Sequence, residues 1–132
     1  MKVFADSNFL ISALATRGLS AELLEILLTS DKLCVSLQVH SEVLEKLERK
    51  FKLPTDHIKE ASTFLTSLVL APNPTKIHYQ LGDQDDEAIL SAAIEFDCAY
   101  FVTGDKDLLA VAEQVIELKI ITPRELWVLL KS

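Results

Sequence analysis

The segment from residue 83 to residue 109 constrains the fold of this chain more than any other part of it. It reads DQDDEAILSAAIEFDCAYFVTGDKDLL. An acidic cluster opens an amphipathic helix, and an apolar strand then ends in a tight turn with two further aspartates. A helix that precedes a strand in a right-handed crossover begins at the edge where the parallel strands end. Asp86 and Asp105 are therefore expected at the same edge of a sheet.

The helix in this segment has two faces. Glu87, Ser91 and Glu95 recur at every fourth residue, which predicts a solvent-exposed face. At about 100° per residue, Asp86 lies nearer the opposite, apolar face.

The rest of the chain alternates between strand and helix patterns. Apolar segments predict strands at residues 2–5, 32–37, 99–102 and 119–121. Periodic patterns predict helices at residues 9–15, 20–30, 38–50, 56–71, 86–96, 108–114 and 123–131, the last opened by the capping box Thr122-Pro123-Arg124-Glu125. Residues 71–82 read as a loop with room for a short extended piece at Lys76–Tyr79.

This alternation predicts an α/β fold. We expect a three-layer α/β/α sandwich with a parallel sheet of about four to five strands. A chain of 132 residues is long enough for one domain and too short for two, so a single domain covering residues 1–132 is expected. Cys34 and Cys98 lie in or beside apolar strand segments, which predicts buried, reduced thiols.

The composition narrows the possible functions. The net charge of −7 argues against a broad basic surface for nucleic acids, although a cation in an acidic cleft would change the local sign. The strongest basic patch, at Lys46, Arg49, Lys50 and Lys52, is interpreted as a solvated helix face. No apolar run could span a bilayer and the start MKVFADS is unlike a signal peptide, so we expect a cytoplasmic protein without membrane contact.

Four carboxylates map to the edge where the strands end. Asp6 follows the first strand, Glu42 lies near the start of the helix after the second, and Asp86 and Asp105 flank the third. Parallel sheets bind ligands at this edge. Two like charges about 4 Å apart repel by roughly 4 kcal/mol at an effective dielectric near 20, so a cation or bound protons must stabilise such a group.

Hard oxygen ligands in an incomplete cage suit Mg²⁺ or Mn²⁺, which retain waters and accept substrate phosphates. The residue types therefore permit metal-assisted hydrolysis of a phosphodiester. The structural alternative is that Asp105 caps the helix that begins at Lys106 and that Asp86 is a first-turn acid favoured by the helix dipole. Periodicity alone assigns Glu42 to the surface.

Four blocks of the sequence together resemble a known family. They read FADSNFLISAL, SLQVHSEVLEKL, DQDDEAILSAAIEFDCAYFVTGDKDLL and IITPRELWVLL, and they cover nearly the whole chain. These blocks resemble the PIN-domain proteins, and within them the small stand-alone toxins of toxin–antitoxin pairs, the VapC-like group. Ser7 stands where that group often has threonine, which keeps the hydroxyl.

The resemblance implies a ribonuclease dependent on Mg²⁺ or Mn²⁺, usually a homodimer, acting on RNA and often inhibited by an antitoxin protein. It implies an acidic quartet of Asp6, Glu42, Asp86 and Asp105, with the following supporting residues: Ser7, Asn8, Thr103, Asp107 and Asp85. Asp86 is chosen over Asp85 as the ligand because Ile89 and Leu90 follow it at the spacing of the family.

Two other functions compete with this one. A metal-dependent phosphohydrolase or phospho-accepting domain would use Asp6 as its nucleophile, but a dehalogenase-type enzyme would also need an aspartate where this chain has Asn8. A non-catalytic PIN-like module could bind a partner without cutting it. The complete quartet argues against such a module.

Overall fold

The computed structural model describes residues 1–16, 18–30 and 32–131. Strands and helices alternate along the chain, as the sequence predicts. Their order and bounds are β1 (Lys2–Ala5), α1 (Ser7–Ala15), α2 (Leu19–Ser30), β2 (Lys32–Ser36), α3 (Leu37–Arg49), α4 (Thr55–Thr66), β3 (Val69–Ala71), α5 (Gln84–Glu95), β4 (Tyr100–Val102), α6 (Lys106–Ala110), the 3₁₀ turn η1 (Ala112–Gln114), β5 (Lys119–Ile121) and α7 (Pro123–Lys131).

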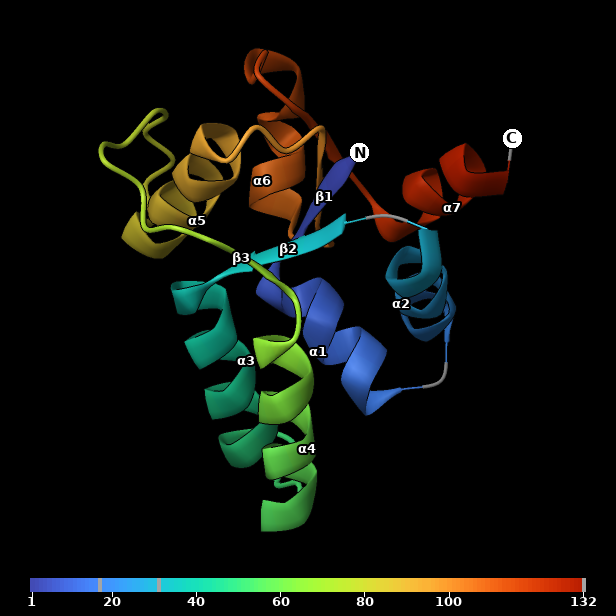
Figure 1. Ribbon diagram of the computed structural model, residues 1–132. Helices are drawn as coiled ribbons and strands as arrows, with labels where there is room; N and C mark the ends of the chain where they lie inside the picture. The colour runs from blue at the N-terminus through green and yellow to red at the C-terminus, as the bar shows by residue number, and fades with distance from the viewer. Residues whose placement is uncertain (17, 31, 132) are drawn as a thin grey trace.

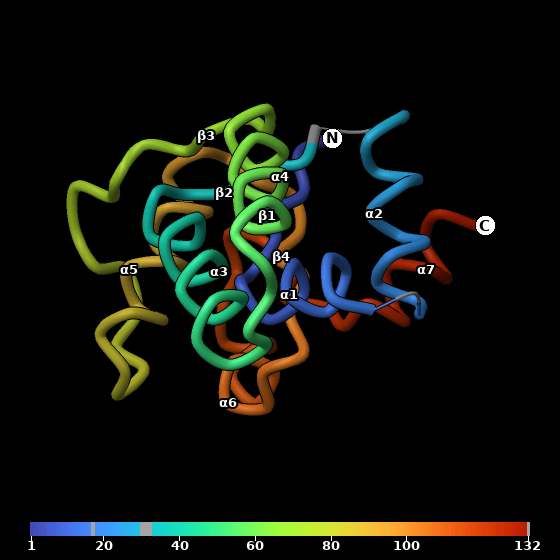
Figure 2. The backbone as a smooth tube through the Cα atoms, turned by 90° about the horizontal axis from the view of Figure 1, so that it is seen from below, coloured from blue at the N-terminus to red at the C-terminus, as the bar shows by residue number. Residues whose placement is uncertain are grey.

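The five strands form one parallel sheet in the order β3-β2-β1-β4-β5. Helices α1 to α4 lie on one side of it and α5 and α6 on the other, while α7 packs beside α2 (Figure 1). Helices α3 and α4 run side by side, as the view in Figure 2 also shows. The predicted three-layer α/β/α sandwich is confirmed.

The centre of the sheet holds the core. Phe4 on β1 and Phe101 on β4 are both fully buried, and their rings stack with centroids 5.4 Å apart. Parallel strands covered by helices on both faces are apolar along their whole length, which is why the central strands read as continuous apolar runs. This core fixes the ends of β1 and β4, and the candidate site lies at those ends.

The predicted C-terminal boundary of the helix at residues 56–71 was wrong. Helix α4 stops at Thr66, and Val69–Ala71 form β3, which pairs with β2 at the edge of the sheet. Periodicity does not separate a short apolar strand from the last turn of a helix, so the helical pattern appeared to continue. The short extended piece considered at Lys76–Tyr79 is not a strand.

The solvent-exposed face predicted for α5 was also wrong, because the loop between β3 and α5 covers it. Ser91 is fully buried, and its Oγ accepts a hydrogen bond from the backbone N–H of His78 at 2.9 Å. Glu87 accepts from the N–H of Leu81 at 2.7 Å, and Glu95 accepts from the loop residues Thr75, Lys76 and His78. The loop amides need acceptors, and these polar side chains supply them.

The predictions for the start of the last helix and for the two cysteines are confirmed. Thr122 and Glu125 form the reciprocal capping box, with both hydrogen bonds at 3.0 Å. Cys34 and Cys98 are buried thiols, and their hydrogen bond together with burial raises the pKa of Cys98. Within the described ranges, no helix is long and apolar enough to cross a membrane.

Candidate active site

Two of the four predicted carboxylates lie side by side at the carboxyl edge of the sheet. Ala5 of β1 pairs in register with Val102 of β4, so the residues after these strands are neighbours. The backbone N–H of Asp6 donates to the carbonyl of Val102 at 3.1 Å. Asp105 lies three residues after Val102 and is the N-cap of α6. Asp6 is likewise the N-cap of α1.

Asp6 is held rigidly. Its side chain is buried, and Oδ1 accepts the N–H of Ser7 at 2.9 Å. Its Oδ2 accepts the Thr103 hydroxyl at 2.7 Å and the Asn8 amide at 3.2 Å. Asn8 Oδ1 in turn accepts the N–H of Gly104 at 3.0 Å, which ties the turn after β4 to the start of α1. Asn8 and Thr103 therefore orient Asp6.

Glu42 comes from the second turn of α3, which follows β2 directly. Its Oε1 accepts the hydroxyl of Ser7 at 3.0 Å. Its Oε2 is buried and has no hydrogen-bond partner among the described residues. An unsatisfied buried carboxylate oxygen costs free energy, so Oε2 is suited to receive a further ligand from the cleft.

The structure separates the acidic residues at the start of α5. Asp83 is its N-cap and accepts the N–H of Asp86 at 3.0 Å. Asp85 is exposed and accepts the side chain of Gln38 at 2.8 Å. Asp86 is partly buried, as is Glu87 on the polar face of the helix. Asp86 lies close enough to Asp105 and Asp6 for their charges to raise its pKa.

These side chains surround an open cleft of about 400 Å³. Seven acidic residues and one lysine line it: Glu42, Glu45, Lys46, Asp83, Asp85, Asp86, Asp105 and Asp107. Three of the predicted quartet are among them, and Asp6 lies buried next to the cleft rather than on its wall. Asp107, predicted as a supporting residue, donates its N–H to Asp105 Oδ1 at 2.8 Å.

Burial and the crowding of negative charge raise the pKa of two carboxyl groups, those of Asp86 and Asp6. Burial is the largest cause that raises the pKa of Asp86 to about 7, and the charges of the following residues contribute in decreasing order: Asp83, Asp105, Asp6 and Glu42. Burial also raises the pKa of Asp6, against the lowering effect of its hydrogen bonds from Thr103 and Ser7. The cleft thus favours partial protonation or a bound cation.

The donor set fits a hard divalent cation held in an open site. Carboxylate oxygens are the ligands that Mg²⁺ and Mn²⁺ prefer, and the buried Oε2 of Glu42 is available to one. Across residues 1–16, 18–30 and 32–131, no group of three or more Asp, Glu, His or Cys side chains converges closely enough to hold a metal ion. Mg²⁺ usually keeps several waters, so an open arrangement suits it.

Three residues of the cleft were missed as site residues: Glu45, Lys46 and Asp83, the N-cap of α5. Glu45 and Lys46 follow Glu42 by three and four positions on α3, which places them one turn further along the same side of the helix. The spacing from Glu42 indicates that Glu45 and Lys46 lie on its side of the helix. The basic patch by itself predicts only a solvated helix face for Lys46.

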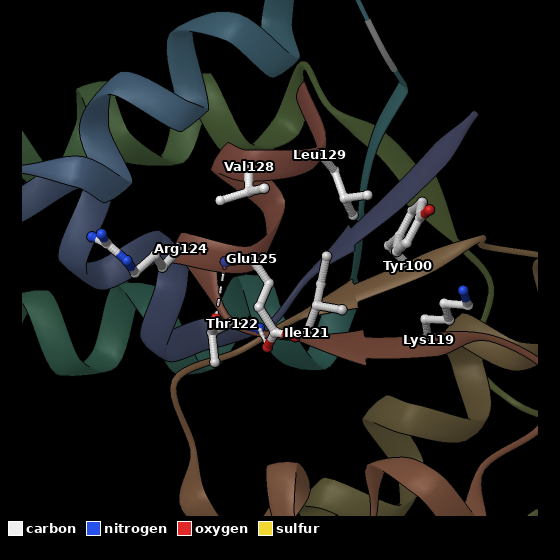
Figure 3. A pocket seen from close by; sticks show the side chains of 8 residues that line it. All are labelled: Tyr100, Lys119, Ile121, Thr122, Arg124, Glu125, Val128 and Leu129. Atoms are coloured by element: carbon white, nitrogen blue, oxygen red, sulfur yellow. Dashed lines mark hydrogen bonds between the residues drawn. The ribbon is translucent and has the colours of Figure 1, made fainter. Parts of the chain in front are cut away.

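A second pocket, of about 520 Å³, lies between α7 and the last two strands (Figure 3). Its lining is mainly apolar and consists of Tyr100, Lys119, Ile121, Thr122, Arg124, Glu125, Val128 and Leu129. Tyr100 and Lys119 stand at the starts of β4 and β5, whereas Asp105 follows the end of β4. This pocket contributes nothing to the acidic cleft.

The sequence profile of the PIN domain family matches residues 2–107, which include all four carboxylates. The chain belongs to the PIN domain family. One relative is the uncharacterized protein MJ1680 of Methanocaldococcus jannaschii, which is 27% identical over 139 residues. The match covers 95% of this chain and 88% of the relative.

Solved structures place this PIN domain among similar folds. VapBC2 from Rickettsia felis, bound to a DNA fragment from its promoter, matches with a TM-score of 0.67 and 17% identity over 92% of this chain and 98% of that chain. VapC20 of Mycobacterium tuberculosis, a toxin that cleaves the sarcin-ricin loop, matches with a TM-score of 0.60 and 14% identity over 89% and 98%. The PIN domain endonuclease Utp24 matches with a TM-score of 0.54 and 21% identity over 92% and 84%.

Proposed function

We propose that this PIN domain is a metal-dependent endoribonuclease that hydrolyses phosphodiester bonds in RNA. The single observation that carries the proposal is the cleft in which Glu42, Asp86 and Asp105 gather beside the buried Asp6. Such a concentration of carboxylates repels a nucleic acid unless a cation is bound between them. The family membership and the nuclease relatives of similar fold support the same reading.

Asp6, Glu42, Asp86 and Asp105 would hold Mg²⁺ or Mn²⁺. The bound ion would lower the pKa of a coordinated water and neutralise charge on the phosphate. The protein's own contribution is orientation: Thr103 and Asn8 fix both the carboxylate of Asp6 and the turn that carries Asp105. The hydroxyl of Ser7 fixes one oxygen of Glu42 and leaves the other for the cleft.

We further propose the toxin role. VapBC2 and VapC20 have this fold, so a small antitoxin protein is a candidate partner and a homodimer a candidate assembly. A cytoplasmic location is part of this proposal, and the buried thiols Cys34 and Cys98 are compatible with a reducing compartment. Coexpression with the protein encoded by the neighbouring reading frame tests the partner, and light scattering tests the dimer.

The experiment that tests the nuclease is cleavage of a mixed pool of structured RNA with Mn²⁺, with EDTA and with Asp6→Asn. We expect cutting with Mn²⁺ that EDTA and the variant both abolish. Asp56→Asn, an exposed acid in the first turn of α4, is the matched control and should cut at the wild-type rate. Cutting by Asp6→Asn at the wild-type rate would refute the proposed centre.

A non-catalytic binding module remains the second candidate. The observation that favours it is that no group of three potential metal ligands converges closely enough to hold an ion in the described part of the chain. Binding of RNA without cutting, together with no change in melting temperature at millimolar Mn²⁺, would support it. The phosphohydrolase alternative is disfavoured, because Asn8 stands where a dehalogenase-type enzyme needs a second aspartate, and its side chain is already bonded to Asp6 and to the N–H of Gly104.

A further inference from the structure

One cation lines the acidic cleft. Lys46 stands on its wall with seven carboxylate side chains, on the helix that also carries Glu42. Long side chains on a helix lean towards its N-terminus, and α3 begins at the sheet edge directly after β2. The side chain of Lys46 is therefore expected to lean towards the turn of α3 that carries Glu42.

Lys46 forms no ion pair with any residue that the structure describes. In the described part of the chain, the ion pairs within 4 Å are Arg49 with Glu45 at 3.3 Å and His78 with Glu95 at 2.9 Å. Glu45, which precedes Lys46 and also lines the cleft, is thus engaged by Arg49. The ammonium group of Lys46 is left to interact with solvent or with a ligand.

The basic charge continues outward along the helix. Glu42, Lys46 and Lys50 are spaced four residues apart, so they follow one side of α3 at intervals of about 6 Å. Lys50 is exposed and ends the helix. Four of the 13 Lys and Arg residues of this acidic chain fall between positions 46 and 52. Helix α3 runs away from the sheet (Figure 1), so a stripe that begins with Glu42 and Lys46 at the cleft leads outward along it.

We propose that Lys46 and Lys50 bind successive phosphates of a single RNA strand and position it as it leaves the acidic cleft. The inference rests on the proposed function, and it names the route of the substrate. A metal ion neutralises only the phosphate at the carboxylates, whereas the neighbouring phosphates meet net negative charge. Lys46 and Lys50 supply the attraction for those phosphates, through backbone contacts that are independent of base sequence.

The test measures the salt dependence of RNA binding. A labelled single-stranded RNA oligonucleotide is titrated between 50 and 200 mM KCl with Mg²⁺, in an Asp6→Asn background that prevents cleavage. Each phosphate contact on a single strand contributes about 0.7 to the slope of log K against log salt. Lys46→Gln should reduce the slope by about 0.7, and Lys46→Gln with Lys50→Gln by about 1.4, equally for unrelated sequences.

Two controls separate charge contacts at this stripe from general effects. Lys46→Arg keeps the charge and should keep the slope. Lys119→Gln removes an exposed lysine at the start of β5, at the opposite end of the sheet from the cleft, and should leave the slope unchanged. Melting temperatures of all variants should agree with that of the parent, because Lys46 and Lys50 are exposed.

The outcomes distinguish the two proposals. Wild-type protein that cuts RNA, with an unchanged slope in Lys46→Gln, overturns the phosphate route and leaves the nuclease standing. A slope that falls as much in Lys119→Gln as in Lys46→Gln also overturns the route. Wild-type protein that neither binds nor cuts RNA overturns the proposed function and this inference with it.

Discussion

The charge crowding in the cleft predicts that Asp86→Asn stabilises the metal-free protein at high pH. Asp86 has its pKa raised to about 7 from 3.8 in the folded protein. A carboxyl group whose pKa is raised on folding destabilises the folded state once it ionises, so the cost is absent below about pH 4 and complete above about pH 7.

The size of the effect follows from the shift. A difference of about three pKa units corresponds to about 4 kcal/mol at pH 8. Asp86 is only partly buried, and solvent screening reduces this figure to roughly 2 kcal/mol. A first-turn carboxylate also gains about 0.3–1 kcal/mol from the helix dipole, which the variant loses. We therefore expect Asp86→Asn to gain about 1–2 kcal/mol at pH 8 and less than about 1 kcal/mol at pH 5.

The assay is urea unfolding in the presence of EDTA at pH 5 and at pH 8. The quantity measured is the free energy of unfolding of the variant minus that of the wild type. Asp85→Asn is the control, because Asp85 is exposed and bonded to Gln38 at the rim. That control should change the free energy of unfolding by less than about 0.5 kcal/mol at either pH. A loss of stability in Asp86→Asn at pH 8, or the same change at both pH values, would refute the reasoning.

Three further predictions follow from the contacts. Mn²⁺ at 100 times its dissociation constant should raise the free energy of unfolding by about 2.7 kcal/mol, and Asp105→Asn should reduce that gain in a thermal-shift titration. Ser91→Ala should cost about 1–3 kcal/mol in urea unfolding, because the buried N–H of His78 loses its acceptor; an unchanged midpoint would contradict that contact. Thr122→Ala should cost about 1 kcal/mol, and Thr122→Ser should restore most of it, because the hydroxyl closes the capping box with Glu125.

The elements whose signals are local were predictable. The central strands are apolar along their length. The start of α7 is specified by the four consecutive residues of a capping box. The end of α4 was not predictable, because Val69–Ala71 becomes a strand only when it pairs with β2. A strand at the edge of a sheet is specified by its partner and not by its own periodicity.

The burial of one face of α5 was also not predictable from local sequence. Glu87, Ser91 and Glu95 have the spacing and polarity of a solvent-exposed surface, and local sequence carries no information about the loop that crosses it. A polar side chain in contact with backbone amides is as well satisfied as one in water. Burial of such a face is therefore decided by the path of a distant segment.

At the candidate site, the sequence alone determined which carboxylates follow which strands, because chain order and parallel topology place them at one edge. Tertiary structure decided their different environments: Asp6 is buried and fully hydrogen-bonded, whereas Asp85 and Asp86 both line the cleft. Asp85 is exposed there and accepts a hydrogen bond from Gln38, and Asp86 is partly buried. Tertiary structure also brought Lys46 to the cleft wall. The physical reason is that spacing fixes the side of a helix on which a residue lies, whereas its desolvation and neighbouring charges depend on elements far away in the chain.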